Sequence, residues 1–430
     1  MNQINYNSKN YKRSRKAYMA QCTFEYFISL LVADAFLAKL LKHIGISDAL
    51  TGIISSFITL AFIIQLCSIF VVKLKVSTKK LVIVSDTISI VFFMLLYFIP
   101  FLPESMDAIK PALIVIGVLI AYAGKYLILS IAFKWGNSFV APGERAIFSA
   151  KKEIVSLASG IIFTLIIGAV VDHFESVKNV EGGFLFIASV MLVVNILNFI
   201  SYLLISKEDE SMHEADGAPM RIVFKETMGN KNFRNIVYLT ILFDCARYVL
   251  VGYMGLFKND LLPSLFFVQA INMLGNFARM FVSVPFGRYS DKKSFAKGFE
   301  LGLWILAISY ICIIFTTDVS WWLIIGYTIL SAVSTAGTNA NSFNITYNYV
   351  PTAYITQAMA FKNSIGGICG FIATLFASRI VNLADANNYI NIFGINLYSQ
   401  QILAAIGLIL IGIAILFLRI RIAKQKIMKQ

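Results

Sequence analysis

Apolar residues occur in long runs that recur along the whole chain, separated by short polar segments. Twelve of these runs have helical length, and they lie near 19–41, 46–72, 79–101, 111–134, 145–171, 182–205, 234–256, 262–286, 295–317, 320–346, 354–382 and 399–421. A helix needs about 20 apolar residues to cross the hydrocarbon core of a bilayer. The strict alternation of a membrane β-barrel does not occur in the sequence. The pattern therefore predicts an all-α membrane protein with twelve transmembrane helices.

The composition agrees with this pattern. The chain has 430 residues, of which 58% are hydrophobic and only 14% are charged, whereas soluble domains average about 25% charged residues. This amount of apolar surface favours an integral membrane protein. The first run is longer than the apolar core of a signal peptide, and no small-residue cleavage pattern follows it. We therefore expect it to remain as the first span.

Basic residues are distributed unevenly between the predicted loops. Of the 37 Lys and Arg, 28 fall on one side of the predicted membrane, with Lys362 counted among them as a loop anchor, and six fall on the other. The remaining three, Lys125, Arg247 and Arg279, lie within spans. Cytoplasmic loops carry the excess of Lys and Arg in membrane proteins. The asymmetry therefore predicts that both termini are cytoplasmic, and it explains the net charge of +14 without a nucleic-acid partner.

The sequence contains no pattern that is typical of an enzyme or a metal site. The five cysteines are scattered through apolar runs without CxxC spacing, and the chain has only three histidines. Such cysteines are expected to be small packing residues. A nucleophile elbow, a phosphate-binding loop and a dinucleotide-binding fingerprint are also missing from the sequence. We therefore predict a protein that is not an enzyme and needs no cofactor or metal ion.

A polar segment of mixed charge, residues 206–233, divides the chain near its middle. Because it falls after the sixth apolar run, it predicts a cytoplasmic linker between two six-helix halves. The N-terminal half is residues 1–205 and the C-terminal half is residues 234–430. The predicted fold is thus two pseudo-symmetric six-helix bundles.

The two halves share traces of an internal repeat. The matched pairs are Phe24 with Phe243, Glu25 with Asp244, Lys39 with Lys258 and, near spans 5 and 11, Gly160 with Gly370. Apolar matches are common between membrane segments and carry little weight. An acid at the same register in two spans is more informative, because a charged residue at the centre of a bilayer costs at least about 2.5–3.5 kcal/mol.

Two short segments resemble motifs of the major facilitator superfamily. GRYSDKK, residues 287–293, is similar to the signature loop G-x-x-x-D-[RK] of that family, and APGERA, residues 141–146, is similar to its lead into span 5. Twelve spans in two halves with a central linker extend the resemblance over nearly the whole chain. The first half departs from the pattern, because its loop VVKLKVSTKKL lacks the glycine and the acid. The subfamily is therefore not identified.

The resemblance implies how such a protein works. In this family, spans 1, 4, 7 and 10 line a central cavity that opens alternately to the two sides of the membrane. The signature loop forms a conformational latch, which here implies that Asp291 meets the start of span 5 near Arg145. Gly287 and Lys292 belong to the same loop.

Polar residues inside the four cavity-lining spans are candidates for a substrate or coupling-ion site. They are Glu25 and Asp34 in span 1, Lys125 in span 4, Asp244 and Arg247 in span 7, and Asn339, Asn341 and Asn344 in span 10. Asp34 has no evident partner at its depth and is the preferred proton site. Structural roles stay open for the others. Glu25 can pair with Lys125 across spans 1 and 4, and Asp244 can pair with Arg247 on one helix face. The asparagines can form interhelical hydrogen bonds.

We therefore predict a monomeric secondary transporter of the plasma membrane that works by alternating access, with a proton or sodium gradient as the candidate drive. Charges of both signs, amides and tyrosines in the cavity-lining spans favour a small polar organic solute, such as a sugar or another metabolite. A multidrug efflux transporter is the alternative within this class. A non-transporting membrane receptor or scaffold is the alternative from another class.

Overall fold

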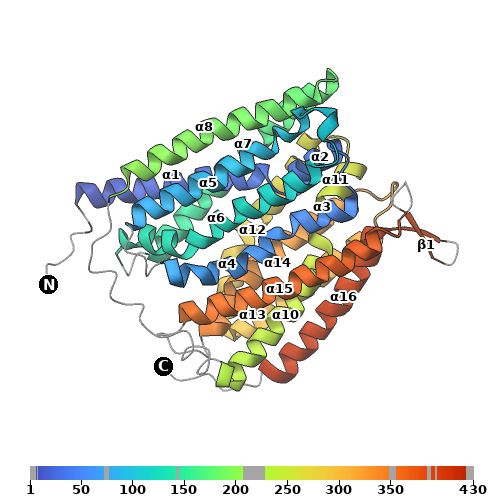
Figure 1. Ribbon diagram of the computed structural model, residues 1–430. Helices are drawn as coiled ribbons and strands as arrows, with labels where there is room; N and C mark the ends of the chain where they lie inside the picture. The colour runs from blue at the N-terminus through green and yellow to red at the C-terminus, as the bar shows by residue number, and fades with distance from the viewer. Residues whose placement is uncertain are drawn as a thin grey trace. The chain divides into compact units, whose positions relative to one another are not determined.

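The computed structural model describes residues 6, 8–71, 77–141, 145–206, 228–347, 355–384, 389–392 and 395–422. This part of the chain is mostly helical (Figure 1). The helices up to residue 204 are α1 (Lys9–Leu31), α2 (Asp34–His43), α3 (Asp48–Ser55), α4 (Phe57–Val71), α5 (Thr78–Leu96), η1 (Ile99–Phe101), η2 (Glu104–Met106), α6 (Lys110–Ser138), α7 (Arg145–Ser176) and α8 (Val180–Leu204). Most of the predicted linker lies outside the described residues.

The second half of the sequence contains helices and one short hairpin. The helices are α10 (Lys231–Val251), α11 (Met254–Leu261), α12 (Leu265–Lys293), α13 (Phe295–Ile314), α14 (Leu323–Tyr347), α15 (Ile355–Val381), α16 (Ser399–Phe417) and η6 (Leu418–Ile422). Strands β1 (Tyr389–Ile392) and β2 (Ile395–Tyr398) pair antiparallel, with Tyr389 opposite Tyr398.

Nine helical segments of the described chain are long and apolar enough to cross a membrane. They correspond to nine of the twelve predicted spans. The other three predicted spans coincide with α1 and α2 together, with α5 and with α14. Charged or amide residues lie within these helices, including Glu25 on α1, Asp86 on α5 and Asn341 on α14. The full count of twelve spans therefore stays a prediction.

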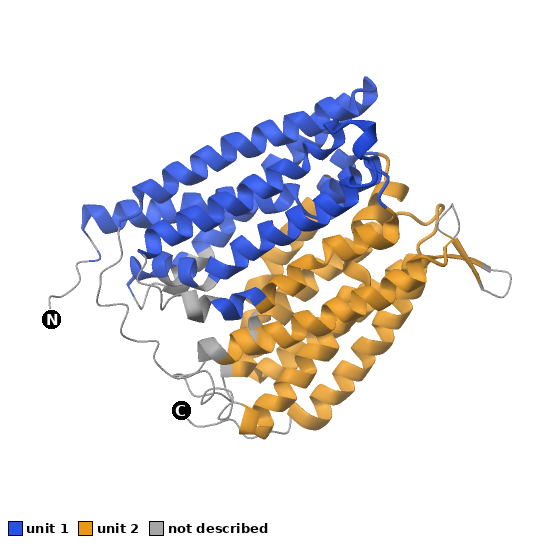
Figure 2. Cartoon of the chain, in the orientation of Figure 1, with its two compact units in different colours: residues 1–46, 64–216, 264–269 blue, residues 47–63, 217–263, 270–430 orange. Residues whose placement is uncertain are grey.

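The chain divides into two compact units (Figure 2). Unit 1 comprises residues 1–46, 64–216 and 264–269, and unit 2 comprises residues 47–63, 217–263 and 270–430. This division follows the two halves of the sequence except for two exchanged segments. Residues 47–63 belong to unit 2, where α3 packs against α15. Residues 264–269 belong to unit 1.

In unit 1, α1 packs against α7 and α8, and α5 packs against α6. Gly160 of α7 permits the close approach of α1, because a β-carbon at this position would lie 2.5 Å from the Tyr26 ring. About three turns further along α7, the Asp172 carboxylate accepts hydrogen bonds from the backbone N–H groups of Leu265 and Phe266, at 3.0 and 2.7 Å. Asp172 thus satisfies two donors at the start of α12, and this contact joins residues 264–269 to unit 1.

Unit 2 repeats the same packing. α10 packs against α15 and α16, and α13 packs against α14. Gly370 of α15 lies beneath Tyr248 of α10, and a β-carbon at Gly370 would be 2.6 Å from the ring. The sequence matched Gly160 with Gly370, and the structure supplies the reason. In each unit a tyrosine of the first helix of the repeat occupies the space above the glycine.

The first helix of each repeat is interrupted, between α1 and α2 and again between α10 and α11. The repeat register aligns these two interruptions. In each unit a buried tyrosine donates a hydrogen bond to a backbone carbonyl of the helix that precedes the interruption. Tyr97 donates to Leu31 O in unit 1, and Tyr310 donates to Ala246 O at 2.9 Å in unit 2. The interruption is therefore a shared feature of the two repeats, and in each unit a buried tyrosine is hydrogen-bonded to the helix before it.

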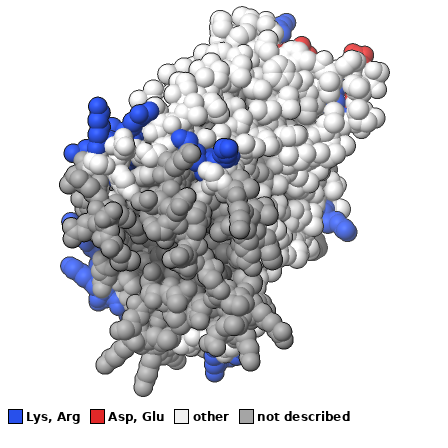
Figure 3. Space-filling view, turned by 60° about the vertical axis from the view of Figure 1, so that its left-hand side comes forward, with Lys and Arg blue, Asp and Glu red and all other residues white. Residues whose placement is uncertain are grey.

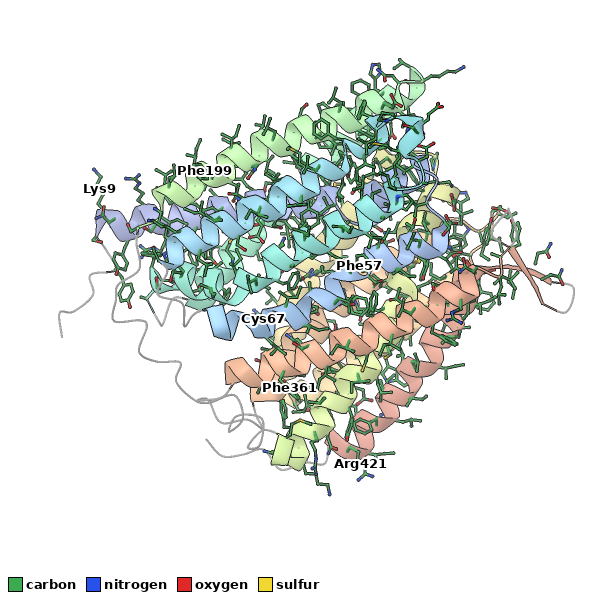
Figure 4. All side chains as sticks on the ribbon, viewed as in Figure 1. Lys9, Phe57, Cys67, Phe199, Phe361 and Arg421 are labelled. Carbon is green, nitrogen blue, oxygen red and sulfur yellow. The ribbon has the colours of Figure 1, made fainter. Side chains whose placement is uncertain are left out.

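The outer surfaces of the helices are largely apolar. Phe199 of α8, labelled in Figure 4, is 41% exposed, and Phe281 of α12 is 77% exposed. On the face shown in Figure 3, most of the described surface is uncharged, and the Lys and Arg side chains stand apart in small groups. Large exposed apolar side chains of this kind are stable against lipid.

Two features differ from the expectations of the sequence. Lys362 is not a loop anchor, because it lies within α15, is 3% exposed and donates to Ser342 Oγ of α14 at 2.9 Å. The β1–β2 hairpin was not indicated by the apolar pattern. Its tyrosines Tyr389 and Tyr398 both donate hydrogen bonds to the Asp318 carboxylate. Both features depend on contacts between distant segments, which a local pattern does not report.

Candidate functional site

Unit 1 contains an ion pair between α1 and α6. Glu25 Oε1 and Lys125 Nζ are 3.1 Å apart, and the two side chains are 25% and 19% exposed. Gln21, one turn earlier on α1, donates to the other carboxylate oxygen of Glu25 at 3.1 Å. The sequence suggested this pair as one possibility, and the structure forms it. Each charge thereby neutralises the other in a place where water is restricted.

Hydrogen bonds extend from this pair to a second carboxyl group. Gln21 also donates to the Tyr202 hydroxyl at 2.9 Å. Tyr202 and Asn198, both on α8, donate to Asp86 Oδ2 at 3.1 and 2.7 Å. Asp86 lies on α5 and is 1% exposed. It was not among the candidate site residues, because the resemblance placed only spans 1, 4, 7 and 10 at the cavity. An acid inside an apolar run was the signal that could have identified it.

Unit 2 contains a cluster of three charged side chains. Asp244 and Arg247 are one turn apart on α10, and Lys362 is on α15, against which α10 packs. The Asp244 carboxylate occupies the space above Gly366, where a β-carbon would lie 2.1 Å from Oδ2. Gly366 is one turn from Lys362 on α15, so Asp244 is within electrostatic range of both cations. Lys362 was missed as a site residue because it was counted as a loop anchor.

The two acids that the repeat aligns have different surroundings. Glu25 is in direct contact with its cation, as described above. Within the described part of the chain, Asp244 forms no direct ion pair or hydrogen bond with Arg247 or Lys362, although it lies among them. The repeat therefore conserved the place of the acid in the two units, while the way in which its charge is balanced diverged.

The asparagines of α14 do not share one environment. Asn341 is 3% exposed, donates to Gly337 O at 2.7 Å and lies against Gly298 of α13, where a β-carbon would be 2.6 Å from its amide nitrogen. Asn339 is exposed and Asn344 is half-buried. Asn341 thus has a packing role between α13 and α14. The other two keep the binding role that the sequence suggested as a hypothesis.

Asp34 is the first residue of α2, at the interruption of the first span. Its backbone is in the left-handed region, with φ of 47°, which is uncommon for any residue except glycine. The residue is half-buried and is not without an interaction partner. Its role as the proton site stays a prediction.

The predicted latch falls on residues that are only partly described. The side chains of Arg145 and Asp291 lie outside the described part of the structure, so their pairing stays a prediction. Gly287 and Lys292, in the same loop motif, are exposed at the end of α12. Among the described residues, no group of three or more His, Cys, Asp or Glu is arranged to hold a metal ion.

The family model described as Major Facilitator Superfamily matches residues 19–374. The chain belongs to the major facilitator superfamily. This major facilitator protein is therefore a multi-pass membrane transporter and not an enzyme. No protein with a curated description matches its sequence.

Several solved transporter structures have a similar fold. The nucleoside transporter NupG has a TM-score of 0.70 and 12% identity, over 97% of this chain and 100% of that chain. An auto-inhibited POT family peptide transporter has a TM-score of 0.70 and 11% identity, over 97% and 98% of the two chains. A bacterial homologue of the iron transporter ferroportin, in an inward-facing state, has a TM-score of 0.62 and 14% identity, over 96% and 98%. At these identities the likeness shows the fold of this major facilitator protein and not its substrate.

Proposed function

We propose that this major facilitator protein is a secondary active transporter of a small polar organic solute. The observation that carries this proposal is the pair of polar clusters in the interiors of the two units. Each is built around an acid at the same register of the repeat, Glu25 on α1 and Asp244 on α10. Charged residues within membrane spans are costly and mark pathways for substrates and ions. A binding site for a hydrophobic drug would not need this many charges and amides.

The remaining features of the proposal follow from the sequence. Twelve spans form two six-helix halves, residues 1–205 and 234–430, joined by a cytoplasmic linker. Both termini are cytoplasmic, because the basic residues gather in the loops of one side. Transport proceeds by alternating access, driven by a proton or sodium gradient and carried out by a monomer in the plasma membrane. A latch between Asp291 and Arg145 stabilises one conformation.

Two of the similar structures are of transporters whose names specify polar organic solutes, nucleosides in one case and peptides in the other. Because the identity is low, these names show only that the same fold can transport polar solutes, which is weak support for a polar solute here. The chain's own charged clusters carry the argument.

Uptake by the purified protein in proteoliposomes tests this function. Labelled sugars, nucleosides, peptides, organic acids and hydrophobic cations are offered separately, with and without an imposed proton or sodium gradient. We expect a gradient to drive accumulation of at least one polar solute, and Glu25→Gln or Asp244→Asn to reduce it at least tenfold. Glu104→Gln, at an exposed position in η2, is the matched control and should leave uptake unchanged. Movement of hydrophobic cations alone would favour multidrug efflux, and no movement of any solute would favour a receptor or scaffold.

A further inference from the structure

The charged cluster of unit 2 contains two cations and one acid. Asp244 and Arg247 are three residues apart on α10 and so lie on one face of that helix. Lys362 approaches from α15 and is 3% exposed. The Asp244 carboxylate is seated above Gly366, one turn from Lys362, and interacts electrostatically with both cations. With all three side chains ionised, the cluster carries one uncompensated positive charge.

The hydrogen-bonding capacity of this cluster is largely unused. An Arg guanidinium has five N–H donors and a Lys ammonium has three. Lys362 uses one donor on Ser342 Oγ. Across the described ranges of the chain, no group accepts a hydrogen bond from Arg247, whose guanidinium lies 5.6 Å from the centroid of the Tyr248 ring. Burying N–H donors without acceptors is unfavourable, so these donors favour an additional acceptor that the described residues do not supply.

Unit 1 provides the comparison. At the aligned position, Glu25 contacts Lys125 at 3.1 Å and also accepts from Gln21. One acid is matched there by one cation in direct contact, so the pair has no excess charge to offer a ligand. Among the described residues of unit 2, Asp244 forms no direct ion pair with Arg247 or Lys362, and this cluster has one cation more than the pair in unit 1.

We propose that Arg247 and Lys362 bind the carboxylate of the transported solute, which is a small organic monoanion. This inference rests on the proposed transport function and narrows its substrate class. A planar guanidinium matches a carboxylate with two parallel hydrogen bonds, and the Lys362 ammonium adds a further donor. One negative charge brings the cluster to neutrality.

Asp244 also contributes to the specificity of the site for its solute. As an ionised carboxylate it is an acceptor only, and its oxygens can receive a hydroxyl or N–H group from the same solute. A second negative charge on the solute would be repelled by it. The site therefore favours a hydroxylated monocarboxylate over a dicarboxylate and over the corresponding neutral molecule.

A thermal-shift experiment with matched solutes tests this site. The purified protein is heated with one solute at a time, chosen from pairs of a carboxylate and a neutral counterpart. The pairs are glucuronate and glucose, gluconate and glucitol, lactate and propane-1,2-diol, and nicotinate and nicotinamide. A ligand that binds the folded state raises Tm by mass action. We expect at least one carboxylate to raise Tm in a dose-dependent way, while its neutral partner does not.

Variants locate the effect. Arg247→Gln and Lys362→Gln should each weaken binding of the active carboxylate by about 10- to 100-fold, because each removes a charged hydrogen-bond donor. Arg247→Lys keeps the charge but loses the planar fork, and it should bind with intermediate affinity. Arg379→Gln, which removes an exposed cation from the same helix α15, is the matched control and should bind like the unmodified protein. Because Arg247→Lys preserves the charge, it keeps the test informative if Arg247→Gln does not fold.

Several results would overturn the carboxylate site. The first is a neutral solute that raises Tm as much as its acid. The second is an acid effect that is undiminished in both Arg247→Lys and Lys362→Gln. The third is a panel in which no carboxylate raises Tm. Proteoliposome uptake separates this failure from failure of the transport function. Accumulation of a neutral solute alone leaves the transporter intact and removes the carboxylate site. Binding of a carboxylate without movement of any solute leaves the site intact and removes the transporter.

Discussion

Removal of the Lys125 cation should destabilise the protein more than removal of the entire Glu25–Lys125 pair. In Lys125→Met, the Glu25 carboxylate loses the ammonium at 3.1 Å and keeps its hydrogen bond from Gln21. In the double variant Glu25→Gln with Lys125→Met, neither charge remains. Breaking a pair on one side leaves a charge without compensation, whereas removing both members does not.

The geometry sets the size of this effect. At 3.1 Å and an effective dielectric constant of about 20, the gross attraction between two unit charges is about 5 kcal/mol. The side chains are still 25% and 19% exposed, so the surroundings screen part of it. We therefore expect a coupling free energy of about 1–3 kcal/mol in a double-mutant cycle.

The assay is thermal unfolding of the purified protein in detergent, followed by tryptophan fluorescence. We expect Tm to fall in the order unmodified protein, double variant, Lys125→Met. The Lys39–Glu175 pair is the matched control, because its carboxylate side chain is 53% exposed. Lys39→Met should therefore cost only about 0.2–1 kcal/mol. A double variant that is no more stable than Lys125→Met would refute the reasoning, as would a Lys125→Met protein with an unchanged Tm.

Three further outcomes can be measured on single variants. Gly370→Ala should cost about 1–3 kcal/mol by overpacking, seen as a lower Tm, because the new β-carbon would lie 2.6 Å from the Tyr248 ring; an unchanged Tm would contradict this packing. Hydrogen bonds, chiefly from Tyr398, lower the pKa of the Asp318 carboxyl. The β1–β2 hairpin should therefore be stable above the usual carboxyl range and loosen as the pH falls below about 4. Faster amide exchange in β1 and β2 at acid pH checks this, and Asp318→Asn should abolish the pH dependence. Asp172→Ala removes the acceptor at the start of α12 and should cost about 0.5–2 kcal/mol of unfolding free energy, while Asp172→Asn, which keeps an oxygen acceptor, should cost less.

The positions of individual acids illustrate how far sequence reasoning reaches. The alignment of Glu25 with Asp244 required only the repeat, because a carboxylate inside an apolar run stands out wherever it occurs. The repeat alone could not predict that Glu25 forms a direct pair with Lys125 whereas Asp244 lies in a looser cluster. This difference depends on how α1 meets α6 and how α10 meets α15, and small rotations of a helix about its axis change which side chains meet.

Asp86 and Lys362 are two further residues whose contacts could not be predicted from the sequence. Asp86 was visible as an acid within an apolar run, but its partners Asn198 and Tyr202 are more than 100 residues away in sequence. Lys362 was assigned to a loop because a basic residue near the end of a span usually anchors there. Its burial against Ser342 follows from the packing of α15 with α14.

The sequence by itself determined the membrane environment, the approximate positions of the apolar spans, the internal repeat and the superfamily. These features are sums over many residues, since hydropathy and basic-residue bias are properties of whole segments. Only the tertiary structure decided the interruptions of the first helix in each repeat, the hydrogen-bonded chain that reaches Asp86 and the grouping of Lys362 with Asp244 and Arg247. Each of these depends on single contacts of a few ångströms between helices that are distant in sequence, and such contacts are decided by side-chain packing rather than by local composition.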